Sequence, residues 1–170
     1  MKIGILTFHY SINQGSVLQA YCVFKLLKLR FPDVQIEIIN LVPFNREFNE
    51  WNFLSKRYPF VKFDNIRRYK SLRKFIKDNA MLSVRRYYRS LKKQTAFINS
   101  LNYDYIFTGS DTVWMDSPKL DSILPHIYYL PKQIRAKKIS IAASVDPLKD
   151  ENPYFEKKHE LKEIFNEYSA

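Results

Sequence analysis

The apolar positions at the start of the chain change from a continuous run to a helical spacing. Residues 2–8 form a short apolar run with β-branched side chains, which is typical of a strand that enters a sheet. A polar loop follows, and over residues 17–27 apolar side chains recur at three- and four-residue intervals. The pattern therefore predicts a strand, a loop and a helix, which is the first half of a βαβ unit.

Later segments continue this pattern. Residues 34–40 alternate and then run apolar, residues 105–108 form a short buried strand, and residues 138–143 form a fourth strand. Residues 153–168 have helical spacing, with Pro153 in the first turn. A strand, a helix and a strand with short connections predict a right-handed parallel crossover. We therefore expect an α/β fold, with a Rossmann-like parallel sheet and flanking helices.

The connecting segments are of two kinds. Residues 41–59 and 116–131 carry several Pro and Asn residues and are predicted to be irregular, the first with one helical turn. Residues 63–98 have a helical composition, with apolar and aromatic residues at helical spacing and Arg or Lys on the other faces. This pattern predicts two helices that are broken near Asn79.

The net charge of +11 is concentrated in that helical segment. Residues 56–98 hold fourteen Lys and Arg but two acidic residues, so we expect a single domain over residues 1–170 with residues 55–100 as a basic helical insertion. Either the insertion is an arm that binds nucleic acid, anionic lipid or a charged polysaccharide, or, as we favour, its helices have a solvated cationic side. No RNA-binding aromatic signature or zinc spacing supports specific nucleic-acid binding. The cations that would hold an anionic surface are Arg85, Arg86, Arg89, Lys92 and Lys93.

Cysteine content and hydropathy indicate the compartment. Cys22 is the single cysteine, which excludes an intramolecular disulfide, and its helical surroundings predict a buried, inert thiol. The chain has no apolar run as long as a membrane helix, and its first residues do not have the pattern of a signal peptide. We therefore expect a cytoplasmic location. No cluster of metal-binding residues is visible, so no metal is assigned.

Polar residues follow the first predicted strand, where an α/β fold collects the groups that bind ligands. They are His9, Asn13, Gly15 and Ser16. Backbone N–H groups of this loop and the N-terminus of the next helix favour an anion. The nucleotide-binding patterns G-x-G-x-x-G and G-x-x-x-x-G-K-[ST] are both absent. Glycine is scarce in this chain, which has three. Gly15, just before the predicted helix, is therefore predicted to lie where the backbone conformation requires glycine.

The strands predicted at residues 105–108 and 138–143 end in similar groups. Gly109, Ser110 and Asp111 follow the first of them, and Ser144 follows the second. A small-residue turn with a hydroxyl and a carboxylate at a strand end either lines a site or caps a following turn. Both interpretations of Ser110 and Asp111 stay open on this evidence.

Three segments carry a combination of residues in a characteristic order. They are residues 1–21, 103–114 and 138–144, and the residues concerned are Asn13, Gly15, Leu18, Gln19, Gly109, Ser110, Asp111, Trp114, Ala142, Ala143 and Ser144. In order and spacing these segments resemble the polysaccharide pyruvyl transferase family. Thr112 differs from the glutamine that is common in that family, and Val145 and Asp146 differ from an aromatic residue and a glycine.

The resemblance implies a particular architecture. It covers the N-terminal half of a protein with two Rossmann-like domains that face each other across a cleft, as in transferases of the GT-B type. In such a protein the Arg and His groups that hold the donor lie mostly in the second domain. We therefore expect this chain to be a fragment whose site is completed by a C-terminal domain or by a second chain.

The resemblance also implies a reaction. The family transfers the pyruvyl group of phosphoenolpyruvate to a sugar of a cell-surface polysaccharide in exopolysaccharide biosynthesis, which yields a cyclic pyruvate ketal and phosphate. This chemistry needs a general acid, a base near the sugar hydroxyls and positive groups for the donor. His9 and Asp111 are the candidate catalytic residues, and Trp114 is a candidate to stack on a sugar. The other candidate substrate-binding residues are Asn13, Gly15, Ser16, Gln19, Gly109, Ser110 and Ser144.

The alternative hypothesis is a non-catalytic binding module. In it the basic segment holds an acidic polymer or the inner face of a membrane, and the protein is peripheral to that membrane. No cofactor is expected under either hypothesis.

Overall fold

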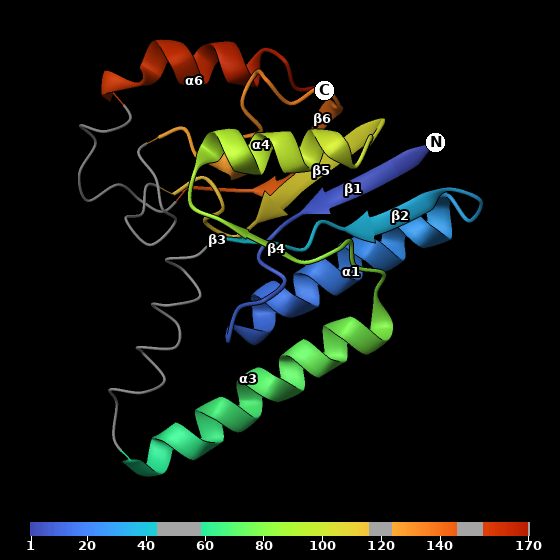
Figure 1. Ribbon diagram of the computed structural model, residues 1–170, viewed down its shortest axis with the longest axis vertical. Helices are drawn as coiled ribbons and strands as arrows, with labels where there is room; N and C mark the ends of the chain where they lie inside the picture. Colours follow the sequence, from blue (N-terminus) through green and yellow to red (C-terminus); the bar gives the residue numbers. More distant parts are fainter. Residues whose placement is uncertain (44–58, 116–123, 146–154, 170) are drawn as a thin grey trace.

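The computed structural model describes residues 1–43, 59–115, 124–145 and 155–169, and a parallel β-sheet forms its centre (Figure 1). The sheet has four strands in the order β2-β1-β5-β6, and every neighbouring pair is parallel. The bounds are Lys2–Leu6 for β1, Gln35–Ile38 for β2, Tyr105–Ser110 for β5 and Lys137–Ala143 for β6. These strands match the predicted ones, so the α/β fold with a Rossmann-like parallel sheet is confirmed.

Helices cover both faces of the sheet (Figure 1). Helices α1 and α3 lie on one side, and α4 and α6 lie on the other. The bounds are Gln14–Arg30 for α1, Pro59–Asn79 for α3, Leu91–Ser100 for α4, Ile127–Tyr129 for the 3₁₀ helix η2 and Lys158–Phe165 for α6. Helix α6 confirms the helix predicted near the end of the chain, whereas Pro153 lies outside the described residues.

Two buried clusters hold the helices to the sheet. Ile3 and Ile5 of β1 pack with one apolar side of α1 and with Ile76 of α3. Leu6 lies in the opposite cluster with Phe97 of α4, together with residues around η2. Successive side chains of a strand point to opposite faces, which is why β1 contributes to both clusters.

The outer side of α1 differs from the prediction. Its buried residues are Ser16, Val17, Ala20, Phe24 and Leu27. Cys22 is exposed, so the prediction of a buried thiol is wrong. Leu18 and Leu26, which share the outward side, are 51% and 56% exposed. Because α1 is apolar nearly all round, its sequence does not indicate which of its apolar stripes faces the sheet.

The basic segment contains both predicted helices, but a different element lies between them. Helix α3 ends at Asn79, as predicted, but the chain then becomes extended and forms strand β4, Arg86–Tyr88. Strand β4 pairs with β3, Leu41–Pro43, in a parallel two-stranded sheet. Helix α4 begins at Leu91, so the second predicted helix is present but starts later than expected, because residues 80–90 are not helical.

Hydrogen bonds to the chain after β2 explain this difference. The N–H of Ile38 donates to the carbonyl of Met81 at 2.8 Å, and the N–H of Ser83 donates back to the carbonyl of Ile38 at 3.0 Å. The N–H of Arg86 donates to the carbonyl of Asn40 at 3.0 Å. The free edge at the end of β2 thus supplies hydrogen-bond partners to the segment after α3. These hydrogen bonds outweigh the modest helical propensity of that segment. Residues 41–43 are correspondingly a strand and not irregular, whereas residues 44–58 and 116–123 lie outside the described residues.

Candidate functional site

The strand order of the sheet has a switch point between two particular strands. The chain runs from β1 to β2 on one side and later returns to β5 on the other side of β1. Ligands of open α/β sheets bind outside the carboxyl ends of the strands at such a switch point. Here the switch point lies at the carboxyl ends of β1 and β5.

Two buried hydroxyls mark this point. Thr7 follows β1 and Ser110 ends β5, and their side-chain oxygens have no hydrogen-bond partner among the described residues. Their exposed fractions are 3% and 0%. A buried hydroxyl without a partner is uncommon and calls for an explanation, such as a water or ligand atom. Ser110 is a predicted site residue, whereas Thr7 was missed because it lies inside an apolar run.

Next to this point, hydrogen bonds join three predicted residues. The Ser144 hydroxyl donates to Asp111 Oδ1 at 3.1 Å, and the Asp111 N–H donates to Gln19 Oε1 at 3.3 Å. The Thr112 N–H in turn donates to Ser144 Oγ at 2.9 Å. The loops after β5 and β6 and the first half of α1 therefore meet at one edge of the sheet. We call Gln19, Asp111 and Ser144 the acidic rim.

Gly109 has a structural reason to be glycine. A Cβ atom built on it would lie 1.8 Å from the carbonyl oxygen of Ile141, on the neighbouring strand β6. The register between β5 and β6 shifts between Thr108 and Ser110 at the same place. Close approach of the two backbones thus excludes a side chain, and it sets how the loops that carry Asp111 and Ser144 leave the sheet.

The N-terminus of α1 is arranged differently from the prediction. The helix begins at Gln14 with Asn13 as its N-cap, so Gly15 lies in the first turn and not in a loop before it. Asn13 Oδ1 accepts the N–H of Gly15 at 2.9 Å, which commits that donor to the cap. No described glycine has a positive φ, so Gly15 is not required by backbone conformation. Ser16 is buried on the sheet side of the helix.

His9 lies on the other side of β1, toward β2. It is 2% exposed, its Nδ1 lies 3.2 Å from the carbonyl oxygen of Thr7, and its Nε2 lies 3.1 Å from Oδ1 of Asn40, just after β2. Burial lowers the pKa of His9 from 6.5 to about 4, and the nearby Arg73 and Arg85 act in the same direction. The ring is therefore neutral near pH 7, which differs from the titrating group expected from sequence.

His9 and the acidic rim have separate surroundings in the described structure. The hydrogen bonds of His9 run to Thr7 and Asn40, whereas those of Asp111 run to Gln19 and Ser144. His9 lines a pocket of about 480 Å³ together with Tyr10, Asn40, Arg73, Ile76, Lys77, Ala80, Leu82 and Arg85. Asn40 is the last residue of the strand predicted over residues 34–40, and its place at a strand end could have identified it. Arg85 was named from the sequence only as a surface cation, and Arg73 was not named.

Trp114 is placed among aromatic side chains. Its ring stacks on Tyr129 with a centroid distance of 6.1 Å and meets the edge of Phe165 at 4.9 Å. Its Nε1 donates to the carbonyl of Tyr128 at 3.1 Å. These contacts fix the ring at the junction of the β5 loop, η2 and α6. Sugar stacking by Trp114 stays a prediction.

Two further kinds of site were considered on the described residues. No three or more His, Cys, Asp or Glu side chains gather there in a way that could hold a metal ion. None of the described helices combines the length and the hydrophobicity that a membrane span requires.

Comparison with known proteins agrees with this geometry. The family model for polysaccharide pyruvyl transferase matches residues 13–170. No curated protein and no solved structure matches the chain. The matched range includes the acidic rim, β5, β6 and every predicted site residue except His9. This chain belongs to the polysaccharide pyruvyl transferase family.

Proposed function

We propose that this chain forms one wall of a site that transfers a pyruvyl group from phosphoenolpyruvate to a sugar of a cell-surface polysaccharide. The acidic rim carries this proposal. Its three residues come from distant parts of the chain, are joined by hydrogen bonds, and lie beside the switch point of the sheet. An exposed carboxylate that a serine hydroxyl holds in place can accept hydrogen bonds from the hydroxyl groups of a sugar.

Asp111 has the central role in the proposed reaction. One of its oxygens accepts the Ser144 hydroxyl, so its orientation is set while the group stays exposed. It accepts a hydrogen bond from an attacking sugar hydroxyl and takes the proton as that hydroxyl forms a bond to the pyruvyl carbon. Ser144 and Gln19 act as positioning residues, and Ser110 and Thr7 offer hydroxyls near the same strand ends.

The proton that reaches the methylene carbon of the donor needs another source. With a pKa of about 4, His9 has almost no proton to give at neutral pH, although it remains a hydrogen-bonding group at the edge of the site. We propose that a second domain or a second chain supplies the general acid and closes a GT-B-like cleft.

The experiment measures phosphate release and ketal formation from phosphoenolpyruvate and a galactose- or mannosamine-containing acceptor. We expect no turnover above background from this chain alone, and turnover once a completing domain or chain is added. In the complete system Asp111→Asn should lower the rate by about a hundredfold or more. Asp104→Asn is the matched control, because Asp104 accepts the Lys2 N–H at the opposite end of the sheet.

Two results would count against the proposal. Equal rates for Asp111→Asn and the unsubstituted protein would remove the acidic rim from the reaction. Robust turnover by this chain alone would show that no further domain is needed.

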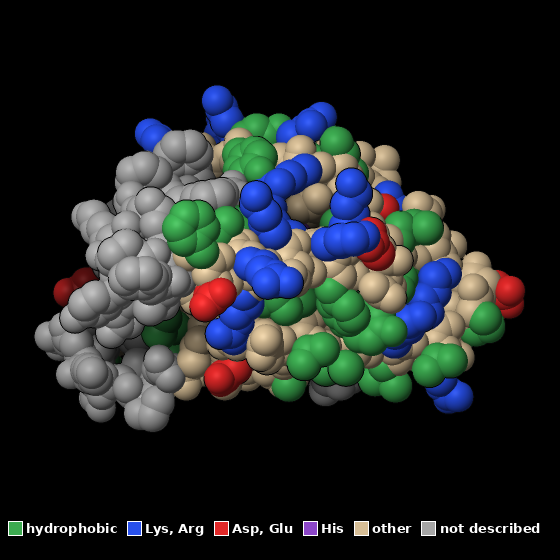
Figure 2. All heavy atoms as spheres, turned by 90° about the horizontal axis from the view of Figure 1, so that it is seen from below, with side chains coloured by type: hydrophobic (Ala, Val, Ile, Leu, Met, Phe, Trp, Pro, Cys, Tyr) green, Lys and Arg blue, Asp and Glu red, His purple; other side chains and the backbone are tan. Residues whose placement is uncertain are grey.

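Binding to an anionic membrane surface is a second candidate function. Figure 2 shows Lys and Arg side chains spread over the face that includes α3, with hydrophobic side chains beside them. Helix α3 carries Arg67, Arg68, Lys70, Lys74 and Lys77, and the exposed leucines of α1 lie on its neighbour. Cations that flank exposed apolar residues are typical of surfaces that bind anionic lipid.

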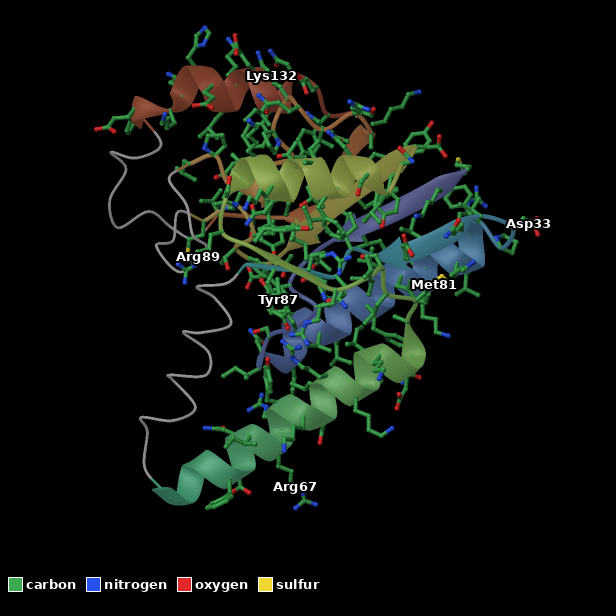
Figure 3. All side chains as sticks on the ribbon, in the orientation of Figure 1. Asp33, Arg67, Met81, Tyr87, Arg89 and Lys132 are labelled. Carbon is green, nitrogen blue, oxygen red and sulfur yellow. The ribbon has the colours of Figure 1, made fainter. Side chains whose placement is uncertain are left out.

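The structure distributes the five cations named from sequence over several elements. Arg85 lines the pocket of His9, Arg86 belongs to β4, and Arg89 follows it (Figure 3). Lys92 and Lys93 lie on α4. Retention on anionic vesicles should therefore fall with salt and be lost when Arg67, Arg68, Lys70, Lys74 and Lys77 of α3 are neutralised. Retention that survives these substitutions would leave the segment as a solvated face, and retention on heparin but not on vesicles would exclude the membrane.

A further inference from the structure

The pocket beside His9 combines groups from four parts of the chain. His9 and Tyr10 follow β1, Asn40 follows β2, Arg73 lies on α3, and Arg85 lies in the extended segment before β4. It therefore opens at the carboxyl edge of the sheet, on the β2 side of the switch point. Its volume of about 480 Å³ falls within the roughly 300–1,000 Å³ of typical small-molecule sites.

The charged residues of this pocket all have the same sign. Arg73, Lys77 and Arg85 line it, and none of its described lining residues is Asp or Glu. Arg73 and Arg85 are half-buried, whereas Lys77 is exposed at the margin. Both guanidinium groups lower the pKa of His9, which shows that their positive potential reaches the interior of the pocket.

Aromatic rings hold the two guanidinium groups. The Arg73 group lies over the ring of Tyr69, 4.6 Å from its centroid, and the Arg85 group lies over the ring of Tyr87 at 4.7 Å. Tyr69 is buried on α3, and Tyr87 is part of β4. Stacking of this kind restricts the orientation of a guanidinium group.

The remaining lining suits an organic ligand better than a bare ion. Ile76, Ala80 and Leu82 supply an apolar wall next to the cations. Tyr10 is anchored by a hydrogen bond of 2.9 Å between its hydroxyl and that of Tyr128, so its position is fixed. The pocket thus pairs a polar, positive part with an apolar part, as sites for small organic anions do.

We propose that this pocket binds the phosphate group of a small organic phosphate, with Arg73 and Arg85 as the principal ligands and Lys77 at the margin. The inference extends the proposed function, because phosphoenolpyruvate is an organic phosphate, and a phosphorylated sugar has the same chemistry. It places an anion site in this chain, in addition to any donor-binding group of a second domain. Forked guanidinium groups match phosphate oxygens two at a time.

The test is isothermal titration of the full chain with phosphoenolpyruvate, with glucose 6-phosphate and with inorganic phosphate. We expect at least one of the two organic phosphates to bind the unsubstituted protein more tightly than inorganic phosphate. Arg73→Gln and Arg85→Gln should each weaken this binding by about tenfold or more. Arg73→Lys and Arg85→Lys, which keep the charge but lose the fork, should weaken it less.

The matched control is Arg67→Gln, which removes one positive charge from the same helix outside the pocket. Arg67 is exposed and points away from the body of the molecule (Figure 3). The Arg67→Gln variant should bind each probe as tightly as the unsubstituted protein does. Far-ultraviolet circular dichroism of every variant separates lost binding from lost folding.

The outcomes divide clearly. Binding of phosphoenolpyruvate that depends on Arg73 and Arg85 assigns the pocket to the donor, and binding of the sugar phosphate alone assigns it to the acceptor. No binding of any probe at millimolar concentration, or equal weakening by Arg67→Gln, overturns the proposal. Titration needs no turnover, so a pocket that binds in a system that transfers nothing would count against the proposed function and not against this inference.

Discussion

The acidic rim and the pocket of His9 lie at the same edge of the sheet but are built in different ways. The rim is centred on the exposed carboxylate of Asp111, beside half-buried Gln19 and Ser144, and hydrogen bonds join the loops that directly follow β5 and β6. The described lining of the pocket includes three cations, and two thirds of its lining residues come from α3 and the extended segment after it. A carboxylate suits hydroxyl groups and clustered guanidinium groups suit anions, so the two regions fit two different ligand groups.

The geometry of the two regions also depends on different parts of the fold. The rim depends on backbone contact between β5 and β6, which are joined throughout their length. The geometry of the pocket depends on the position of α3 and on the hydrogen bonds of residues 80–85 to the end of β2. The predictions below test these two dependences.

The largest effect is expected at Gly109. Gly109→Ala should lower the free energy of unfolding by about 3 kcal/mol or more, because its Cβ would lie 1.8 Å from the backbone oxygen of Ile141. Urea denaturation measures the loss. Gly15→Ala is the control, because its Cβ would meet Asn13 Oδ1 at 3.2 Å within a helical turn, and we expect a change within about 1 kcal/mol. Similar losses for the two variants would contradict the role given to the strand contact.

The next effect concerns the pH dependence of stability at His9. Its pKa is about 4 in the folded protein, below 6.5 for an ordinary histidine. Between these values the unfolded chain binds more protons at this position, so the free energy of unfolding falls as the pH falls from 6.5 to 4, by roughly 3 kcal/mol in total. His9→Gln should remove this component of the slope.

Urea denaturation at a series of pH values gives that slope, and the NMR signals of the histidine rings give the pKa itself. The control is His159→Gln, because the His159 side chain is 89% exposed and its removal should leave the slope nearly unchanged. Titration of His9 near pH 6.5 would show that the ring is not buried as described, and would weaken the distinction between pocket and rim.

The smallest effect is expected at Ser144. Ser144→Ala removes the hydroxyl that donates to Asp111 and accepts from the Thr112 N–H, and should cost about 1 kcal/mol of stability. Ser140→Ala, at an exposed position of the same strand, should cost less than half of that. Equal costs measured by thermal unfolding would show that the hydrogen bonds of the rim do not hold the loop.

Local patterns predicted much of the framework of this protein. The four strands, the first helix and the polar residues at the ends of β1, β5 and β6 follow from alternation, helical spacing and small-residue turns. Asp111 and Ser144 of the rim were therefore accessible from these elements, whereas Gln19 was identified by the family resemblance. Asn40 belongs to the same class, because it is the last residue of the second predicted strand and lies two residues after β2.

The predictions that differ from the structure share one cause. A local sequence pattern does not specify which residues pack against an element. Cys22 and the second helix of the basic segment were misplaced because each depends on what lies opposite. Gly15 lies within the helix because Asn13 is the N-cap of that helix. The local sequence allows an N-cap at several positions, so it does not fix the residue at which the helix begins.

The sequence alone determined the class of fold, through its periodicity, and placed Asp111 and Ser144 at strand ends, whereas the family and Gln19 followed from the resemblance of three segments to known proteins. The tertiary structure alone decided the pocket, because Arg73 and Arg85 meet His9 and Asn40 only when the segment after α3 pairs with the backbone beyond β2. It also decided the charge state of His9, because the low pKa arises from burial by elements distant in sequence, a quantity that no local pattern encodes.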